Sequence, residues 1–136
     1  MSTMLLEIVT PERKIYGQQV NMVIAKGIDG ELGILPNHIP LVTPLKIAAV
    51  TAKIEGSKDH VVAVHGGFME IRKDKVVILA ESAELAEDID ADRAARARER
   101  AETRLRETKE QNVDFVRAQR SLERAMLRMD VKSRNA

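Results

Sequence analysis

The sequence has no cysteine, no tryptophan and only three aromatic residues, Tyr16, Phe68 and Phe115. A chain without cysteine forms no disulfide and binds no zinc through thiolates, which is compatible with a reducing compartment. No apolar run approaches the roughly 20 residues that a membrane-spanning helix needs. Glu7 interrupts the N-terminal apolar segment where a signal peptide would continue, so we expect no cleaved signal. A soluble protein facing the cytoplasm is favoured, and peripheral attachment to a membrane complex stays open.

Common catalytic and phosphate-binding patterns are also missing. The chain has no Walker A motif, no GxGxxG and no GxSxG nucleophile elbow. Its histidines, His38, His60 and His65, stand near expected turns without metal-site spacing, which favours structural roles. We therefore expect neither a catalytic site nor a metal site. A net charge of +1 and the scarcity of aromatic residues for base stacking argue against nucleic acid as a partner.

Glycine and proline are confined to the front of the chain. All seven glycines lie at or before Gly67, and all four prolines lie at or before Pro44. Because these residues form turns and interrupt helices, their distribution predicts a strand-rich front and a helical back. We place the division between residues 1–86 and 87–136. The predicted fold is α+β, with an N-terminal antiparallel β-sandwich followed by a C-terminal antiparallel two-helix hairpin.

The front contains six short segments that are rich in Val and Ile and bounded by turn-forming residues. These segments are 4–9, 20–25, 45–54, 60–64, 68–72 and 75–80, with turns expected at 28–33, 55–59 and 65–67. Three prolines within residues 35–45 predict a loop or an edge segment there. Many short strands without helices between them favour an antiparallel sandwich or barrel.

The back is predicted to form helices over about 90–108 and 113–131, joined by a turn at 109–112. Four acids, Glu87, Asp88, Asp90 and Asp92, cluster where a first helical turn favours negative charge. Each helix has an apolar stripe that would seal the pair. The stripes are Ala94, Ala97, Ala101 and Leu105 on one helix, and Phe115, Ala118, Leu122, Ala125 and Met129 on the other. Because alanine buries little surface, we expect the hairpin to be marginal alone and to need the sandwich.

Arginines form a second stripe on each predicted helix. They are Arg93, Arg96, Arg100 and Arg104 on the first, and Arg117, Arg120, Arg124 and Arg128 on the second. Both sets step by 3, 4 and 4 and flank the apolar stripe on the same side, so antiparallel packing would join them into one basic face. The expected register pairs Arg93 with Arg128, Arg96 with Arg124, Arg100 with Arg120 and Arg104 with Arg117.

A solvated charged surface is the alternative interpretation of this face. Four acids, Glu99, Glu107, Glu110 and Glu123, can neutralise part of it from positions three or four residues away. Against that interpretation, residues 87–136 contain eleven arginines and only two lysines. The planar guanidinium suits bidentate contact with phosphate or carboxylate, which solubility alone does not require.

Two segments of the front carry a family resemblance. Residues 27–45, GIDGELGILPNHIPLVTPL, and residues 65–84, HGGFMEIRKDKVVILAESAE, resemble the epsilon subunit of bacterial F-type ATP synthases. The resemblance extends from the N-terminal EIVTPE to the helical tail. It implies the same sandwich and hairpin, in a non-catalytic rotor subunit on the cytoplasmic face of the cell membrane, without insertion into it. The sandwich would bind the gamma subunit and the c ring, and within residues 27–45 Glu31 and His38 are candidate contacts.

The resemblance also implies a regulatory tail. In this family the tail folds against the sandwich, or extends along gamma toward the alpha/beta catalytic head and suppresses ATP hydrolysis. Residues 89–94, IDADRA, match the I/L-D-x-x-R-A motif with which some bacterial members bind ATP in the folded state, and residues 123–128, ERAMLR, resemble a segment that supplies two arginines. The residues carried over by position are Glu84, Ile89, Asp90, Arg93, Ala94, Arg100, Arg124 and Arg128.

ATP is thus expected as a regulatory ligand and not as a catalytic cofactor, and whether Mg²⁺ accompanies it is left open. Asp90 has a structural interpretation as well, because an acid at the start of a helix caps it. The alternative function is a constitutive coupling subunit whose tail does not respond to nucleotide. An independent ATPase is disfavoured, because the sequence offers no catalytic base and no metal site.

Overall fold

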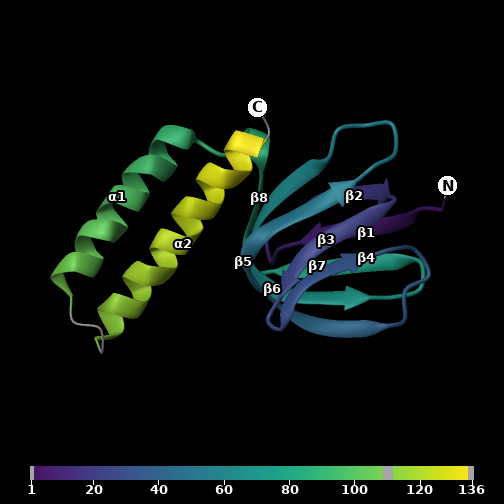
Figure 1. Ribbon diagram of the computed structural model, residues 1–136, viewed down its shortest axis with the longest axis horizontal. Helices are drawn as coiled ribbons and strands as arrows, with labels where there is room; N and C mark the ends of the chain where they lie inside the picture. The colour runs from purple at the N-terminus through teal and green to yellow at the C-terminus, as the bar shows by residue number, and fades with distance from the viewer. Residues whose placement is uncertain (1, 109–111, 135–136) are drawn as a thin grey trace. The chain divides into compact units, whose positions relative to one another are not determined.

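The computed structural model describes residues 2–108 and 112–134 (Figure 1). The chain divides into two units, residues 1–85 and 86–136. The first unit contains β1 (Met4–Val9), β2 (Lys14–Val20), β3 (Met22–Gly27), β4 (Gly30–Ile34), β5 (Leu41–Lys53), β6 (His60–Ile71), β7 (Lys75–Ala80) and β8 (Ala83–Leu85). The second contains a 3₁₀ turn, η1 (Ala86–Asp88), and two helices, α1 (Ala91–Glu107) and α2 (Val113–Arg134).

The first unit is a β-sandwich with the strand order β2-β1-β7-β6-β5-β3-β4, and β8 also pairs with β6. The longest strands, β5 and β6, pair with each other along most of their length. β6 exchanges partners midway, because its first half pairs with β8 and its second half with β7. The largest fully buried side chains include Met4, Leu6, Ile8, Ile34, Met69, Ile71 and Ile78. The predicted α+β class, a sandwich followed by two helices, is confirmed.

The sandwich is mixed, whereas the sequence predicts a wholly antiparallel one. β1 pairs antiparallel with β2 on one side and parallel with β7 on the other, for example Ile8 with Ile78. A hairpin fixes the relative direction of consecutive strands such as β1 and β2. No hairpin joins β1 to β7, so their direction follows from the path of the intervening chain.

The turn predicted at residues 65–67 is wrong, because β6 runs through it without a break. Gly66 and Gly67 have φ values of 84° and 131°, which bend the strand where it exchanges partners. At Gly67 a Cβ atom would lie 2.2 Å from the carbonyl oxygen of Leu79 and 2.8 Å from the Cα of Ala80. Glycine is therefore required at position 67 for close approach of two strands as well as for its dihedral angles.

The segment of three prolines is partly a loop, as predicted, and partly strand. Residues 35–40 are irregular, but β5 begins at Leu41 and includes Pro44. Pro44 pairs with Phe68 of β6, while β5 meets β3 only from Leu45 onward. Its carbonyl still accepts a hydrogen bond from the amide of Ile28, at 3.1 Å. Pro44 is tolerated because this end of β5 forms a ladder with β6 only. An N–H directed to the other side of the strand is therefore not needed.

Three strands, β2, β4 and β8, were not predicted, and the predicted strand over residues 20–25 is divided. Asn21 separates β2 from β3. Its amide donates to the carbonyl of Lys53 at 2.8 Å, and its side-chain oxygen accepts from the amide of Glu55 at 2.6 Å. A side chain that accepts a bond from a neighbouring backbone amide stabilises a corner here, where the alternating pattern alone predicts one continuous strand.

The helices lie side by side in antiparallel directions (Figure 1). Of the nine residues in the predicted stripes, Ala94, Ala101, Ala118 and Ala125 are buried and the other five are half-buried, while Leu127 and Val131 are buried outside the prediction. α2 continues to Arg134, beyond its predicted end. Of the four acids assigned to a first helical turn, Glu87 and Asp88 instead belong to η1. The turn predicted at 109–112, and the candidate acid Glu110 in it, lie outside the described residues except for Asn112. No helix among the described residues is long and apolar enough to cross a membrane.

Replacing Gly67 with alanine should destabilise the sandwich by about 2–4 kcal/mol, because the new Cβ meets backbone atoms that cannot move aside. Urea unfolding followed by fluorescence of Tyr16, the single tyrosine, reports this unit in a chain without tryptophan. Gly17→Ala is the matched control, since its Cβ would meet only the flexible side chain of Lys14. Equal unfolding midpoints for the two variants would contradict the steric account.

Glu7 on β1 lies between two lysines from the flanking strands. Lys75 Nζ is 2.6 Å from one carboxylate oxygen of Glu7, and Lys14 Nζ is 3.4 Å from the other. The hydrogen bond from Lys75 holds the pKa of Glu7 below its ordinary value, with a smaller lowering by Lys14 and an opposing effect of partial burial. The ionised carboxylate therefore stabilises the fold above the unfolded pKa of about 4.3, and this contribution is lost as the pH falls through the lower folded value.

Replacing Glu7 with glutamine should thus lower the urea midpoint at pH 7 and have progressively less effect as the pH falls below the unfolded pKa of about 4.3 and the wild-type carboxylate becomes protonated. The measurement is Tyr16-monitored unfolding of both proteins between pH 3 and pH 7. A difference that stayed constant over this range would contradict the assignment.

Candidate functional site

Asp90 caps the N-terminus of α1. Its backbone is extended, with φ −87° and ψ 107°, and its Oδ1 accepts a hydrogen bond from the amide of Arg93 at 3.1 Å. The carbonyl of Asp90 accepts from the amide of Ala94. The Asp-x-x-Arg spacing therefore satisfies otherwise unpaired donors of the first turn. Asp90 itself is exposed, so its second oxygen and the adjoining Arg93 side chain face solvent.

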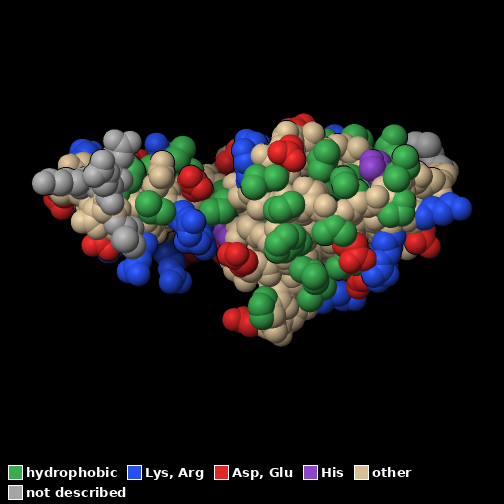
Figure 2. Space-filling view, turned by 90° about the horizontal axis from the view of Figure 1, so that it is seen from below, with side chains coloured by type: hydrophobic (Ala, Val, Ile, Leu, Met, Phe, Trp, Pro, Cys, Tyr) green, Lys and Arg blue, Asp and Glu red, His purple; other side chains and the backbone are tan. Residues whose placement is uncertain are grey.

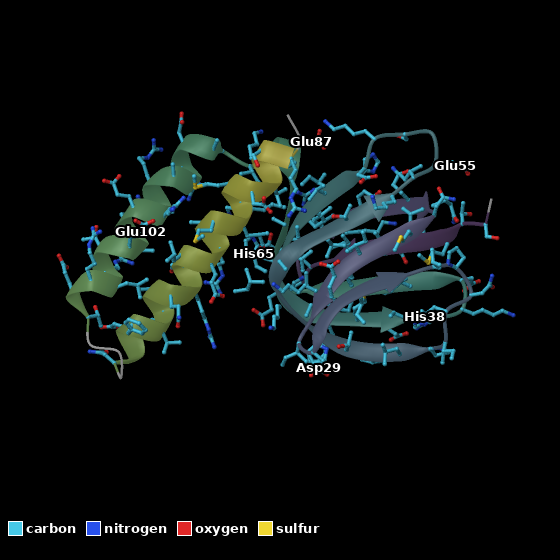
Figure 3. The ribbon with its side chains drawn as sticks, in the orientation of Figure 1. Asp29, His38, Glu55, His65, Glu87 and Glu102 are labelled. Carbon is cyan, nitrogen blue, oxygen red and sulfur yellow. The ribbon has the colours of Figure 1, made fainter. Side chains whose placement is uncertain are left out.

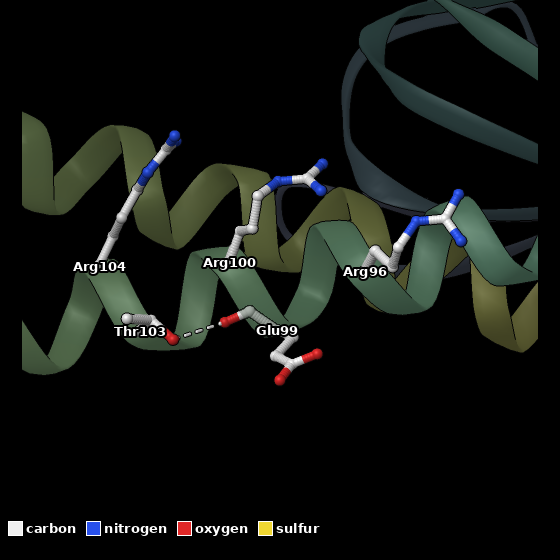
Figure 4. Close-up of a pocket in the computed structure, with 5 residues that line it drawn as sticks. All are labelled: Arg96, Glu99, Arg100, Thr103 and Arg104. Atoms are coloured by element: carbon white, nitrogen blue, oxygen red, sulfur yellow. Dashed lines mark hydrogen bonds between the residues drawn. The ribbon is translucent and has the colours of Figure 1, made fainter.

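Three arginines from successive turns of α1 line a shallow groove with a volume of about 430 Å³ (Figure 4). They are Arg96, Arg100 and Arg104, and Glu99 and Thr103 complete the lining. In Figure 4 the three guanidinium groups project to one side, while the Glu99 carboxylate points away from them. Such a row of planar donors suits a ligand with several anionic oxygens.

The groove arginines are not neutralised by neighbouring acids. Within residues 2–108 and 112–134, none of Arg96, Arg100 and Arg104 forms an ion pair. Two ion pairs of the hairpin are local ones, Arg98 with Glu102 and Arg134 with Asp130. The described part of the hairpin thus offers a concentration of positive charge, which Figure 2 shows as Lys and Arg side chains gathered on the helical unit.

Two arginines of the α2 stripe are less exposed than those of α1. Arg124 and Arg128 are half-buried, whereas Arg117 and Arg120 are exposed. None of the four lines the α1 groove as far as the described residues show. The structure thus brings Arg100 together with Arg96 and Arg104, and gathers neither Arg93, Arg124 nor Arg128 into the same groove. Convergence of both arginine stripes on one ligand remains a prediction.

The end of α2 is attached to the start of the helical unit. Lys132 Nζ donates to the carbonyl oxygen of Ala86 in η1 at 3.2 Å. Ala86, Ile89 and Val131 are all buried, with Val131 at 0% exposed. Because Ile89 and Ala94 are each only 3% exposed, these two predicted site residues belong to the interior of the unit and offer little surface to a ligand.

Glu84, the remaining residue of the predicted nucleotide set, lies on β8 of the sandwich. Its Oε1 is 3.0 Å from Nε2 of His65 on β6, a residue labelled in Figure 3. Glu84 therefore belongs to a different unit from Asp90 and the arginines, and the structure describes each unit by itself.

The sandwich has an exposed apolar surface, which we call the apolar edge. It consists of Ile28, Leu35, Ile39, Leu41, Val42, Phe68 and Leu79, each at least 42% exposed. Phe68 pairs with Pro44 on one side and with Leu79 on the other, so these residues form one row across three strands. Figure 2 shows the hydrophobic side chains gathered on this unit. So much exposed apolar surface is typical of a protein-binding site.

The predicted partner contacts lie in the same region. Glu31 is exposed on β4 opposite Lys26. His38 is half-buried, and its Nδ1 donates to the carbonyl of Ile39 at 2.6 Å. Both fall within residues 27–45, which contain five of the seven apolar-edge residues. Sequence reasoning missed Phe68 and Leu79, although their outward positions in β6 and β7 follow from strand alternation.

Two family models cover nearly the whole chain. The model for the beta-sandwich domain of the ATP synthase Delta/Epsilon chain matches residues 3–86, and the model for its long alpha-helix domain matches residues 87–133. The chain belongs to the ATP synthase delta/epsilon chain family. No group of three or more potential metal ligands lies in the part of this family member that the structure describes.

Curated relatives in this family match over most or all of their length. The ATP synthase epsilon chain of Halalkalibacterium halodurans is 54% identical over 134 residues, which is 98% of this chain and 100% of that one. The epsilon chain of Brevibacillus brevis is 64% identical over 107 residues, 79% of this chain and 81% of that one.

A solved structure has the same fold. A chain in the cryo-EM structure of the Euglena gracilis mitochondrial ATP synthase, OSCP/F1/c-ring, matches with a TM-score of 0.78 and 23% identity, covering 90% of this chain and 77% of that one.

Replacing Asp90 with alanine should lower the stability of the first turn of α1 by about 1 kcal/mol, because the amide of Arg93 loses its acceptor. Hydrogen exchange of the first-turn amides, measured by NMR, should be about fivefold faster. Asp90→Ser retains a capping oxygen and should exchange nearly as slowly as wild type. Equal exchange in Asp90→Ala and wild type would show that the cap contributes nothing.

Proposed function

We propose that this protein is the non-catalytic epsilon subunit of the central stalk of an F-type ATP synthase, with a helical tail that inhibits ATP hydrolysis when it extends. Support for the stalk assignment comes from the family membership and the full-length match to curated epsilon chains. The chain is then a peripheral component on the cytoplasmic face of the cell membrane and not itself an enzyme.

The apolar edge supports a role for the sandwich in docking other subunits. A surface that exposes Phe68, Leu79 and Ile39 is covered in the working state by a partner of matching apolar character. The gamma subunit and the c ring are the partners that this proposal assigns to it, with Glu31 and His38 as polar contacts beside the apolar residues. The cryo-EM relative comes from an assembly that contains F1 and a c-ring.

ATP is the proposed ligand of the folded tail. The observation that carries this part is the groove in which Arg96, Arg100 and Arg104 project together without ion-pair partners among the described residues. A triphosphate offers several anionic oxygens to such a row, and each guanidinium forms charge-assisted hydrogen bonds with them. The proposed site is completed by residues that match the family motif, Glu84, Ile89, Asp90, Arg93, Ala94, Arg124 and Arg128.

ATP would then act as a switch between tail conformations. A ligand that binds only the folded tail stabilises it by RT ln(1 + [L]/Kd), about 2.7 kcal/mol at a concentration one hundred times Kd. That amount converts an evenly balanced equilibrium into one state almost completely. When the tail extends, the same basic face meets acidic surfaces of the alpha/beta head, so ATP and the head compete for it.

Titration of the isolated full-length protein with ATP, followed by NMR and calorimetry with and without Mg²⁺, tests the proposal. Arg100→Ala and Arg93→Ala should each weaken binding about tenfold, the loss expected for one charge-assisted contact. Arg98→Ala is the matched control on the same helix, because Arg98 pairs with Glu102 outside the groove, at 2.7 Å. It should bind ATP within about twofold of wild type.

The titration also decides between the two functions that the sequence left open. If the protein shows no response at millimolar ATP, the constitutive coupling subunit is the remaining function. Asp90 would then serve only as the helix cap. Unchanged binding by Arg93→Ala and Arg100→Ala would show that ATP binds elsewhere. Release of phosphate by the pure protein would instead establish an ATPase.

A further inference from the structure

Among the residues that the structure describes, His65 is the one buried polar or charged residue, at 2% exposed. Its Nε2 is 3.0 Å from Oε1 of Glu84, whose side chain is 30% exposed. Its Nδ1 is buried and has no hydrogen-bond partner in the part of the chain that the structure describes. A buried polar group with one partner and one unused nitrogen calls for a specific role.

The backbone holds both residues of this pair in place. Glu84 on β8 lies opposite Ala63 on β6, so His65 is its diagonal neighbour on the same face of the sheet. The small side chain of Ala63 leaves the Glu84 side chain free to reach His65. Two further bonds fix the strand beside the ring, from the amide of His65 to the carbonyl of Ser82 at 2.9 Å and from the amide of Glu81 to the carbonyl of Gly66 at 3.2 Å.

These contacts determine which ring nitrogen carries the proton. A carboxylate oxygen only accepts, so Nε2 must be the donor toward Glu84. A proton on Nδ1 would be a buried donor without an acceptor, which is costly. The ring is therefore held as the Nε2–H tautomer, and its hydrogen bond to Oε1 orients the carboxylate of Glu84.

We infer that His65 is the positioning residue of Glu84 and fixes the carboxylate in the orientation in which it serves the nucleotide site. This inference rests on the function proposed above, in which Glu84 is one of the ATP ligands. Glu84 stands on a strand of only three residues, and its bond to His65 is one anchor of its side chain. His65 provides that anchor from a buried position, where its ring is held by packing on all sides. Through this bond His65 contributes to nucleotide affinity without touching the ligand.

Nitrogen-15 NMR of the wild-type histidine rings tests the geometry without ATP. We expect His65 to be in the Nε2–H tautomer, with a ring shift that moves in Glu84→Gln, while the shift of His60, which bonds Tyr16 at 2.7 Å, does not change. An Nδ1–H tautomer, a mixture of both forms, or a His65 shift insensitive to Glu84→Gln would overturn the inference.

ATP titration of His65 variants tests the consequence. His65→Ala should bind ATP about tenfold more weakly, the order of one hydrogen bond to a charged group. His65→Gln should recover most of this affinity, because its amide can donate to Glu84 in place of Nε2. His60→Gln is the matched control and should bind as wild type does. Amide spectra of each variant establish that it is folded.

Two results would also overturn the positioning role. One is equal ATP affinity of His65→Ala and wild type. The other is an equal loss of ATP affinity in His65→Ala and His65→Gln, because it would show that His65 acts through packing alone. If wild-type protein binds no ATP, the proposed nucleotide site is wrong. In that case the tautomer measurement still decides whether His65 orients Glu84, so the two failures are distinguishable.

Discussion

The close approach of β6 to β7 at Gly67 is the constraint on which the sandwich depends. It lets one strand bend and exchange partners, so that β7 covers one half of β6 and β8 the other. Two consequences follow from this single point. The exchange exposes Phe68 and Leu79 side by side on the apolar edge, and it directs the chain into β8, where Glu84 meets His65. A backbone requirement at one glycine thereby positions both the apolar pair and the His65–Glu84 pair.

In the helical unit, small side chains determine where the charge lies. Ala94, Ala101, Ala118 and Ala125 occupy the buried positions between the helices, so the two backbones approach closely and the long side chains are directed outward. The arginines of α1 then stand in a row with a spacing set by the helical repeat. Alanine contributes little burial, which makes the paired state of the helices adjustable by ligands of modest affinity.

Local chemistry made part of this structure predictable. β1 and β7 follow from runs of Val, Ile and Leu bounded by polar residues, and the α1 cap follows from Asp90 before an alanine-rich segment. Features that depend on residues far apart in the chain could not be predicted from the sequence. Gly66 and Gly67 indicate a turn unless Leu79 is known to lie against them, and Glu84 meets His65 across 19 positions. The arginine stripe of α1 was predictable from its period, but the half-burial of Arg124 and Arg128 depends on tertiary packing.

The bond between Lys132 and Ala86 joins positions 46 apart, which makes the helical unit a closed loop. Closing a loop costs an entropy that grows only with the logarithm of its length, so the connection between the helices tolerates insertions at little energetic cost. The bond between Lys132 and Ala86, by contrast, lies at the opposite end of the helix pair from that connection. Substitutions around Lys132 would therefore change how firmly the unit is closed and leave the arginine groove untouched.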